Sequence, residues 1–229
     1  MSRPLFSLDN RLALCAEYVQ KGAAVADIGT DHGYLPVWLA KTGKIHHAIA
    51  ADINPLPLEH GLATIKKYHA EDMVETRLSD GLQAINPQEA DNIIIAGMGG
   101  ELIAAIIHKA SWLQDNTKTL ILQPMSRSHL LREYLYKNGF DIVKERAVKA
   151  DGRLYSVMVA TYTGAVTTGI EVKSYIGKLS PKKQPLDKAY IENKISALSR
   201  KAHGIALSGD VNMTATLQKI IKELKEAAK

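Results

Sequence analysis

The feature that most constrains the fold is a repeated alternation between short apolar runs and amphipathic segments. Each apolar run ends at Gly, Asp, Asn or Pro, which is typical of buried strands. The runs cover residues 23–29, 47–53, 74–79, 92–97 and 119–124. Helical patterns separate or follow them at about 34–42, 55–70, 99–110 and 127–138. Near-continuous apolar strands separated by helices predict an α/β domain with a parallel sheet covered on both faces.

This alternation stops after residue 138. The stretch "FDIVKERAVKADGRLYSVMVATYT" has the pattern of two long strands. They are joined at Asp151-Gly152, a pair typical of a tight β-hairpin. The sequence therefore predicts that an antiparallel hairpin is added to the sheet at its C-terminal end.

The residues after Thr163 follow a different pattern. "GAVTTG" resembles a linker, and "KLSPKKQP" interrupts any regular element. Two apolar series with spacings of four and three residues follow, as in the seam of a coiled coil. They are Ile191, Ile195, Leu198, Ala202 and Ile205, then Met213, Leu217, Ile220 and Leu224. We therefore expect two domains, residues 1–163 and 164–229, the second an antiparallel two-helix coiled-coil hairpin.

The net charge of +5 is unevenly distributed along the chain. Residues 1–160 carry 17 Lys and Arg against 18 Asp and Glu, whereas residues 161–229 carry 12 against 6. A basic appendage on a neutral domain suggests a polyanionic partner. The alternative is a lysine-rich helical face that is simply solvated.

Composition and termini indicate a cytoplasmic protein. No apolar stretch approaches the ~20 residues of a membrane span, so no membrane partner is expected. The N-terminal residues "MSRPLFSLDNR" lack the apolar region of a signal peptide. The single cysteine, Cys15, excludes an intramolecular disulfide and is expected to be a buried small hydrophobe.

The turn after the first predicted strand, in "VADIGTDHGYLP", has the composition of a ligand-binding loop. In open parallel sheets ligands bind beyond the carboxyl ends of the strands, where glycine allows a close backbone approach. Gly29 and Gly33 flank Asp31, at a position where dinucleotide-binding turns favour glycine. A carboxylate there repels a diphosphate but suits S-adenosylmethionine, which carries an ammonium, a sulfonium and ribose hydroxyls.

The next three strands also end in residues suited to a cofactor. Asp52 lies 19 residues beyond Gly33, where an acidic side chain accepts bonds from ribose hydroxyls in either cofactor class. Asp80 is placed to accept from an adenine amine, with Gly81 leaving room for the ring. The fourth strand ends in "AGMGG", where Gly97, Gly99 and Gly100 leave bare backbone next to the reacting methyl group. Met98, in the same loop, contacts the cofactor or only packs.

Several motifs together resemble the bacterial tRNA (adenine-22, N1)-methyltransferases. These are "NRLALCAEYV", "VADIGTDHGYLP", "IIIAGMGGELI", "LILQPMSRSHLLREYLYKNGFDIV" and "GRLYSVMVA". The resemblance implies a Rossmann-like class I fold, S-adenosyl-L-methionine as cofactor with S-adenosyl-L-homocysteine as product, and tRNA as substrate. It also implies cofactor contacts at Asp27, Gly29, Asp31, His32, Asp52, Asp80, Gly81 and Gly97. Gly33, where many members have alanine, is a conservative departure and is kept as a cofactor residue.

The chemistry of adenine N1 narrows the candidates for catalysis. N1 has a free lone pair, so it attacks without prior deprotonation, and catalysis can rest mainly on positioning. Asp31 is a candidate for stabilising the cationic product, although binding the cofactor's ammonium is its other role. Gln123 is a candidate for contacting the target base, although it could equally fix the Pro124 turn.

RNA contacts are predicted at basic residues in two regions. Arg127 and Arg132 begin the helix after the fifth strand, and Arg11 contacts either a phosphate or the methionine carboxylate. Tyr155 is expected in the sheet core. In the C-terminal third the candidates are Lys182, Lys183, Lys188, Lys194, Arg200 and Lys201.

Alternatives to tRNA methylation remain open at this point. Methylation of another RNA or of a small molecule keeps the cofactor but changes the substrate. A nicotinamide oxidoreductase and a non-enzymatic RNA-binding module are further options. We expect no metal site, because no His-x-x-Cys spacing accompanies Cys15. The oligomeric state is open, a monomer being one option.

Overall fold

The computed structural model describes residues 4–229, which contain a seven-stranded sheet of order β3-β2-β1-β4-β5-β7-β6. The first five strands are parallel, and β7 is antiparallel to both β5 and β6, which confirms the predicted fold class. The second strand of the hairpin lies against β5, so β6 forms the sheet edge. The strands are β1 (Ala23–Ile28), β2 (Ile45–Asp52), β3 (Val74–Leu78), β4 (Asn92–Gly99), β5 (Thr119–Ser126), β6 (Phe140–Ala150) and β7 (Arg153–Tyr162).

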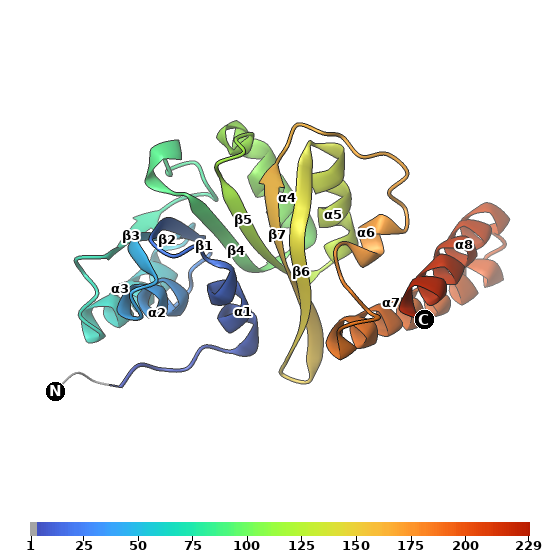
Figure 1. Cartoon of the computed structure of the whole chain (residues 1–229), viewed down its shortest axis with the longest axis horizontal. Helices are drawn as coiled ribbons and strands as arrows, with labels where there is room; N and C mark the ends of the chain where they lie inside the picture. The colour runs from blue at the N-terminus through green and yellow to red at the C-terminus, as the bar shows by residue number, and fades with distance from the viewer. Residues whose placement is uncertain (1–3) are drawn as a thin grey trace.

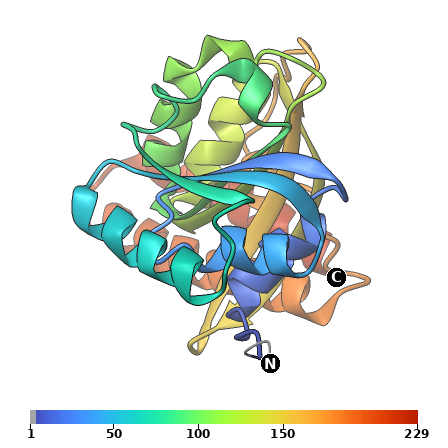
Figure 2. The same cartoon turned by 90° about the vertical axis from the view of Figure 1, so that its left-hand side faces the viewer.

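Helices cover both faces of the sheet (Figure 2). They are α1 (Asn10–Tyr18), α2 (Tyr34–Lys41), α3 (Pro55–Lys67), α4 (Gly100–Lys109), α5 (Ser128–Lys137), α6 (Lys173–Ile176), α7 (Pro185–Leu207) and α8 (Val211–Ala228), with short 3₁₀ turns η1 (Pro87–Glu89) and η2 (Ser111–Leu113). Successive strand side chains point to opposite faces. Ile93 and Ile95 of β4 therefore pack with α4 and α5, whereas Ile94 packs with α1, α2 and α3. None of the helices within residues 4–229 is long and apolar enough to cross a membrane.

The C-terminal helices α7 and α8 extend away from the sheet on the side of β6 (Figure 1). Most of the predicted seam is buried between them, including Leu198, Ala202, Leu217 and Leu224. Met213 is 46% exposed and lies outside this cluster, so the first predicted seam position of α8 is not buried.

A buried polar cluster, which we call the junction network, connects α7 to the sheet domain. It consists of Ser128, Arg132, Glu145, Asp187 and Tyr190. Arg132 Nη2 lies 2.6 Å from Glu145 Oε1, and neither side chain has exposed surface. The Ser128 hydroxyl and the Tyr190 hydroxyl are 2.7 Å apart. Asp187 accepts hydrogen bonds from the Ala147 and Ser180 backbone N–H groups at 2.7 and 2.8 Å.

The predicted phosphate contact of Arg132 is therefore wrong. Its guanidinium also donates to the Ser174 carbonyl at 3.0 Å and to the Ser156 hydroxyl at 3.1 Å. Burial opposes its charge, but the Glu145 carboxylate outweighs this and raises the pKa of Arg132 above its ordinary value. Arg132 is a structural residue that binds α5, β6 and α6 together.

Candidate active site

A cavity of about 410 Å³ opens at the carboxyl ends of β1, β2 and β4. This is the sheet edge where ligands bind in open α/β folds. Seven of the predicted cofactor residues line it: Asp27, Gly29, Asp31, His32, Asp52, Gly97 and Met98. Asp9, Arg11, Leu12, Thr30, Tyr34, Leu35 and Ala96 complete the lining. The structure thus brings these predicted residues together although the first and the last, Asp27 and Met98, are 71 positions apart in the sequence.

Two glycines of the turn between β1 and α2 have positive φ and close neighbours. Gly29 has φ +77°, and a Cβ there would lie 2.2 Å from Met98 Cε. Met98 is therefore packed over the turn. Gly33 has φ +66°, and a Cβ there would lie 3.1 Å from the Cα of Gly61 in α3. Gly33 does not line the cavity; it lets α3 approach the turn closely.

Asp27 is a buried carboxyl at the floor of the cavity, with only 5% of its surface exposed. The Thr30 hydroxyl donates to it at 2.8 Å. Burial raises the pKa of Asp27 to about 6, the Thr30 hydrogen bond opposes this, and nearby Asp52 adds to it. A cationic ligand beside Asp27 would favour its charged form.

Asp52 ends β2 and faces the same cavity. Its Oδ1 accepts the Asn54 backbone N–H at 2.8 Å, which orients the carboxylate.

Asp31 and His32 form the rim of the cavity. Asp31 adopts a left-handed conformation, φ +46°, and its side chain is 69% exposed. Its Oδ2 lies 3.5 Å from His32 Nε2. The His32 ring stacks on His60 with 5.0 Å between centroids. Within residues 4–229, Asp31, His32 and His60 place one ligand atom each within 4.8 Å of one another, so the expected absence of a metal stays a prediction.

Asp80 and Gly81 lie apart from the other predicted cofactor residues. Asp80 lines a neighbouring cavity of about 310 Å³, together with Leu82, Lys109 and Trp112. Lys109 Nζ approaches Asp80 Oδ2 to 3.3 Å. The adenine contact expected at Asp80 and Gly81 stays a prediction, and it requires the ligand to reach beyond the larger cavity.

Gln123 lies in β5, next to the Gly97 loop near the end of β4. Its side chain is fully buried, so the expected direct contact with a base is not available to it. Its Oε1 accepts the Gly97 N–H at 3.2 Å and an Arg11 N–H at 3.4 Å, while its Nε2 donates to the Pro124 carbonyl at 3.2 Å. Gln123 therefore positions the Gly97 backbone and Arg11, and it fixes the Pro124 turn.

Arg11 lies between the cavity and the ends of β5 and β7. It pairs with Asp9 at 3.1 Å, contacts Met125 Sδ at 3.0 Å and lies over the Tyr155 ring at 5.5 Å. Tyr155 is buried in the core, as expected. Because Arg11 lines the cavity, its guanidinium is available as a counter-charge to the carboxylate of a ligand bound there.

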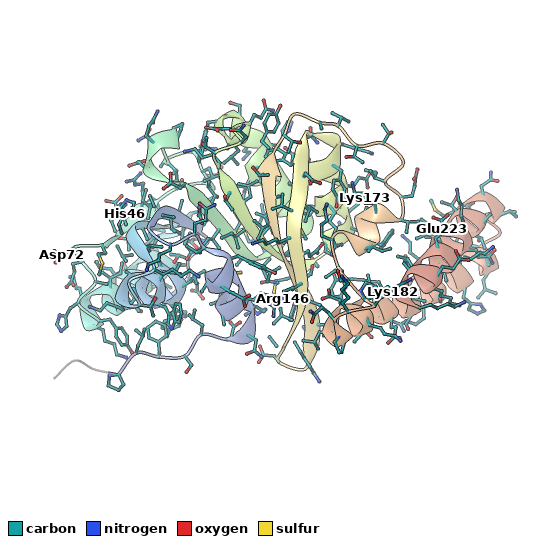
Figure 3. All side chains as sticks on the ribbon, in the orientation of Figure 1. His46, Asp72, Arg146, Lys173, Lys182 and Glu223 are labelled. Carbon is teal, nitrogen blue, oxygen red and sulfur yellow. The ribbon has the colours of Figure 1, made fainter. Side chains whose placement is uncertain are left out.

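The remaining predicted RNA contacts are basic side chains at the surface. Arg127 is exposed and pairs with Glu101 at the start of α4. Lys182 lies just before α7, on the side of the molecule toward β6 (Figure 3). Lys194 is half-buried, with its ammonium 4.8 Å from the centre of the Tyr190 ring. The other hairpin candidates are exposed: Lys182, Lys183, Lys188, Arg200 and Lys201.

Sequence reasoning missed the aromatic side chains around the rim. Tyr34 lines the cavity from the first residue of α2, and Phe6 contacts it from the N-terminal segment. The adjacency of Tyr34 to Gly33 was a usable signal, because the first residue after a ligand-binding turn faces the ligand edge. The contribution of Phe6 had no signal in the local pattern.

Comparison with known proteins identifies the family of this chain. The methyltransferase domain family matches residues 8–158. A solved structure of the B. subtilis m1A22 tRNA methyltransferase TrmK superposes with a TM-score of 0.85 at 30% identity, covering 99% of this chain and 100% of that one. This chain belongs to the tRNA (adenine-22, N1)-methyltransferase family.

Two further comparisons define the extent of the similarity. The tRNA (adenine(22)-N(1))-methyltransferase of Bacillus subtilis is 39% identical over 153 residues, or 67% of this chain. That alignment spans 64% of the Bacillus protein, slightly less than two thirds of its length. M. capricolum TrmK in complex with S-adenosyl-homocysteine matches with a TM-score of 0.79 at 26% identity, covering 97% of each chain.

Proposed function

We propose that this protein transfers the methyl group of S-adenosylmethionine to N1 of adenine 22 in tRNA. The observation that carries the proposal is the cavity at the carboxyl ends of β1, β2 and β4, with Asp27, Asp52 and the Gly97 loop on its walls. Membership of the tRNA (adenine-22, N1)-methyltransferase family supplies the substrate.

The residues of the cavity fit S-adenosylmethionine. Asp27, Asp31 and Asp52 are acceptors suited to a ligand that carries positive charge and hydroxyl groups. Gly97 exposes backbone at the same cavity, and a Cβ there would meet no protein atom within 4 Å and would occupy ligand space. A diphosphate would meet three carboxylates, so a dinucleotide fits less well. We propose Asp52 as the ribose acceptor and Arg11 as the partner of the methionine carboxylate.

The proposed chemistry depends on positioning and charge stabilisation. When bound, S-adenosylmethionine supplies a methyl group, which adenine N1 takes with its lone pair while the carbon–sulfur bond breaks. The positive charge then resides on the base. We propose that Asp31, which is exposed at the rim, stabilises that charge. Gln123 holds the Gly97 N–H and so fixes the loop beside the reacting groups.

We assign tRNA positioning to the helical hairpin, residues 164–229, as the second domain. Its exposed Lys182, Lys183 and Lys188 lie where α7 begins, close to the sheet domain. Lysines neutralise phosphates without reading sequence, so they position the tRNA and leave base selection to the active site. Arg127 is a further candidate for phosphate contact. We infer that the protein works in the cytoplasm, with its tRNA substrate.

The decisive experiment is nucleoside mass spectrometry of unmodified tRNA incubated with the protein and methyl-labelled S-adenosylmethionine. We expect labelled 1-methyladenosine from tRNA, and none from the same tRNA in which adenine 22 is replaced by guanine. Label in another nucleoside, or undiminished 1-methyladenosine from the guanine variant, would contradict the proposal.

The role of the hairpin is best tested by charge removal. Truncation after Thr163 would remove Asp187 and Tyr190 from the junction network and leave Arg132 and Glu145 uncovered. Replacing Lys182, Lys183 and Lys188 together with Gln avoids this problem, because all three are exposed.

If these lysines neutralise phosphates, each lost contact lowers the salt slope of tRNA binding by roughly 0.7–0.9. The matched control replaces three exposed lysines outside the hairpin, Lys21, Lys137 and Lys144, with Gln. Fluorescence anisotropy over a salt series measures both slopes. Equal slopes for the two triple variants would remove the hairpin from tRNA positioning.

A further inference from the structure

An unbroken series of aromatic rings runs past the mouth of the cavity. We call it the aromatic row; in order it contains Tyr68, Phe6, Tyr34, His32 and His60. Neighbouring ring centroids are 5.0 Å apart, except for Tyr34 and His32 at 5.4 Å. Tyr34 and His32, in the middle of the row, line the cavity, so the row passes the mouth of the active site and extends beyond it at both ends.

The row combines a structural end with an accessible end. Phe6 and Tyr68 are half-buried and pack on the hydrophobic core formed with α2 and α3. Tyr34 is 44% exposed, and His60 is also exposed. Packing of the N-terminal segment accounts for Phe6 and Tyr68, but it does not account for the exposed rings of Tyr34 and His60.

The charges around the accessible end favour a base over a phosphate. Asp31 and Glu59 are exposed beside His32 and His60 in the chain. Carboxylates repel phosphate groups, whereas a neutral nucleobase has no such penalty. The lysines suited to phosphates lie on the hairpin, so the RNA backbone can be held there while a base reaches the row.

We propose that the aromatic row stacks against an unpaired nucleobase of the RNA substrate that neighbours the adenine to be methylated. The proposal rests on the proposed function, because N1 lies on the pairing edge and is reached only when the adenine leaves its pair. Opening that pair deprives the adjacent base of its stacking partner. Aromatic side chains replace such stacking for any base, independently of sequence.

The test uses the full chain and a tRNA that carries 2-aminopurine next to adenine 22, with S-adenosyl-homocysteine present to prevent turnover. Stacking on the row quenches the fluorescence of 2-aminopurine. Wild type, Tyr34→Phe and His60→Phe are expected to quench it. Tyr34→Leu and His60→Ala are expected to lose the quenching and to bind the tRNA about 5- to 150-fold more weakly, the range for one stacked base.

Two controls separate stacking from other effects. Calorimetry with S-adenosyl-homocysteine reports the cofactor site of every variant, and His60 lies outside the lining of the cavity, so His60→Ala is expected to retain wild-type affinity. Tyr134→Leu removes a half-buried tyrosine that contacts His108 on the opposite face of the sheet. It is expected to quench and bind as wild type does.

The outcomes distinguish this inference from the proposed function. If wild type methylates adenine 22, but Tyr34→Leu and His60→Ala quench and bind like wild type, the aromatic row has no role in stacking and the proposed function stands. If wild type methylates no adenine, yet its quenching requires Tyr34 and His60, the stacking site stands and the proposed function is lost. Quenching lost equally in Tyr134→Leu would also overturn the stacking role.

Discussion

The cavity and the junction network handle buried charge in opposite ways. In the junction network, Glu145 and Arg132 have no exposed surface and contact each other at 2.6 Å. In the cavity, Asp27 is almost as buried, but its partner there is the neutral hydroxyl of Thr30, and its pKa is raised to about 6. A buried charge with an opposite partner stabilises the fold, whereas a buried carboxyl without one is suited to a cationic ligand.

The largest effect is expected when the junction network loses one charge. Arg132→Ala leaves Glu145 buried without a counter-charge, which typically costs about 3–5 kcal/mol in the free energy of unfolding. Denaturant unfolding measures this change. Cofactor affinity of the molecules that remain folded should be unaffected, because Arg132 does not line the cavity.

A double variant sharpens this result. Arg132→Met with Glu145→Leu removes both charges and keeps apolar volume, so it is expected to recover much of the lost stability. If the double variant is as unstable as Arg132→Ala, packing and hydrogen bonds to Ser156 and Ser174 matter more than the ion pair.

The difference between the two regions also explains what could be predicted from sequence. The sheet followed from short apolar runs, and the seam from four-and-three spacing, because both patterns record burial directly. The cavity followed from polar or glycine residues at the ends of strands, and Asp27, Asp52 and Gly97 do meet there. These features are local in sequence, and the topology of a parallel sheet places them at one edge.

Arg132 could not be interpreted in the same way. As a charged residue near a strand end, it has the same local pattern as the exposed Arg127. Its burial depends on Glu145 in β6 and Ser174 in α6, and the short helix α6 was not predicted. Of the two roles left open for Gln123, only the fixing of the Pro124 turn is seen, and its partner Arg11, 112 residues away, has no signal in the local pattern.

The next largest effect concerns the ribose contact. If Asp52 accepts hydroxyl hydrogen bonds from the cofactor, Asp52→Ala lowers affinity by about 1.5–3 kcal/mol per lost bond to the charged group. Calorimetry with S-adenosyl-homocysteine checks this. The stability of the free protein should change little, in contrast to Arg132→Ala. Unchanged affinity would show that another group holds the ribose.

A smaller effect is expected from the titration of Asp27. Its raised pKa means that the proton is bound more tightly in the folded, ligand-free state, so folded stability falls as pH rises from about 4 through about 6. The ammonium of a ligand bound beside Asp27 would reverse the preference and favour the deprotonated carboxylate. Affinity for S-adenosyl-homocysteine should therefore fall about tenfold from pH 7 to pH 5, or ~1.4 kcal/mol. The ligand's amine, with an ordinary pKa of roughly 7.7–8.0, stays protonated in this range.

Asp27→Asn isolates that titration. The side chain keeps its shape but no longer ionises in this range, so the pH dependence should disappear and affinity at pH 7 should be weaker than in wild type. Persistence of the same tenfold change in Asp27→Asn would assign the titration to another group.

The smallest effect is expected at Arg127, which adjoins both regions. It precedes Ser128 of the junction network. Its carbonyl also lies close to Gly100, which follows the Gly97 loop, because a Cβ added at Gly100 would be only 2.5 Å from the Arg127 carbonyl oxygen. Its side chain is nevertheless 60% exposed, and its partner Glu101 is 53% exposed. Exposed ion pairs contribute only about 0.2–1 kcal/mol, so Arg127→Gln should alter the free energy of unfolding by no more than this.

If Arg127 also contacts a phosphate, the same variant lowers the salt slope of tRNA binding by roughly 0.7–0.9. Glu101→Gln is the matched control, because it removes the same pair but keeps the cation. If Arg127→Gln lowers the free energy of unfolding as much as Arg132→Ala does, the two regions do not differ as described. An exposed charge would then stabilise the fold as much as a buried one.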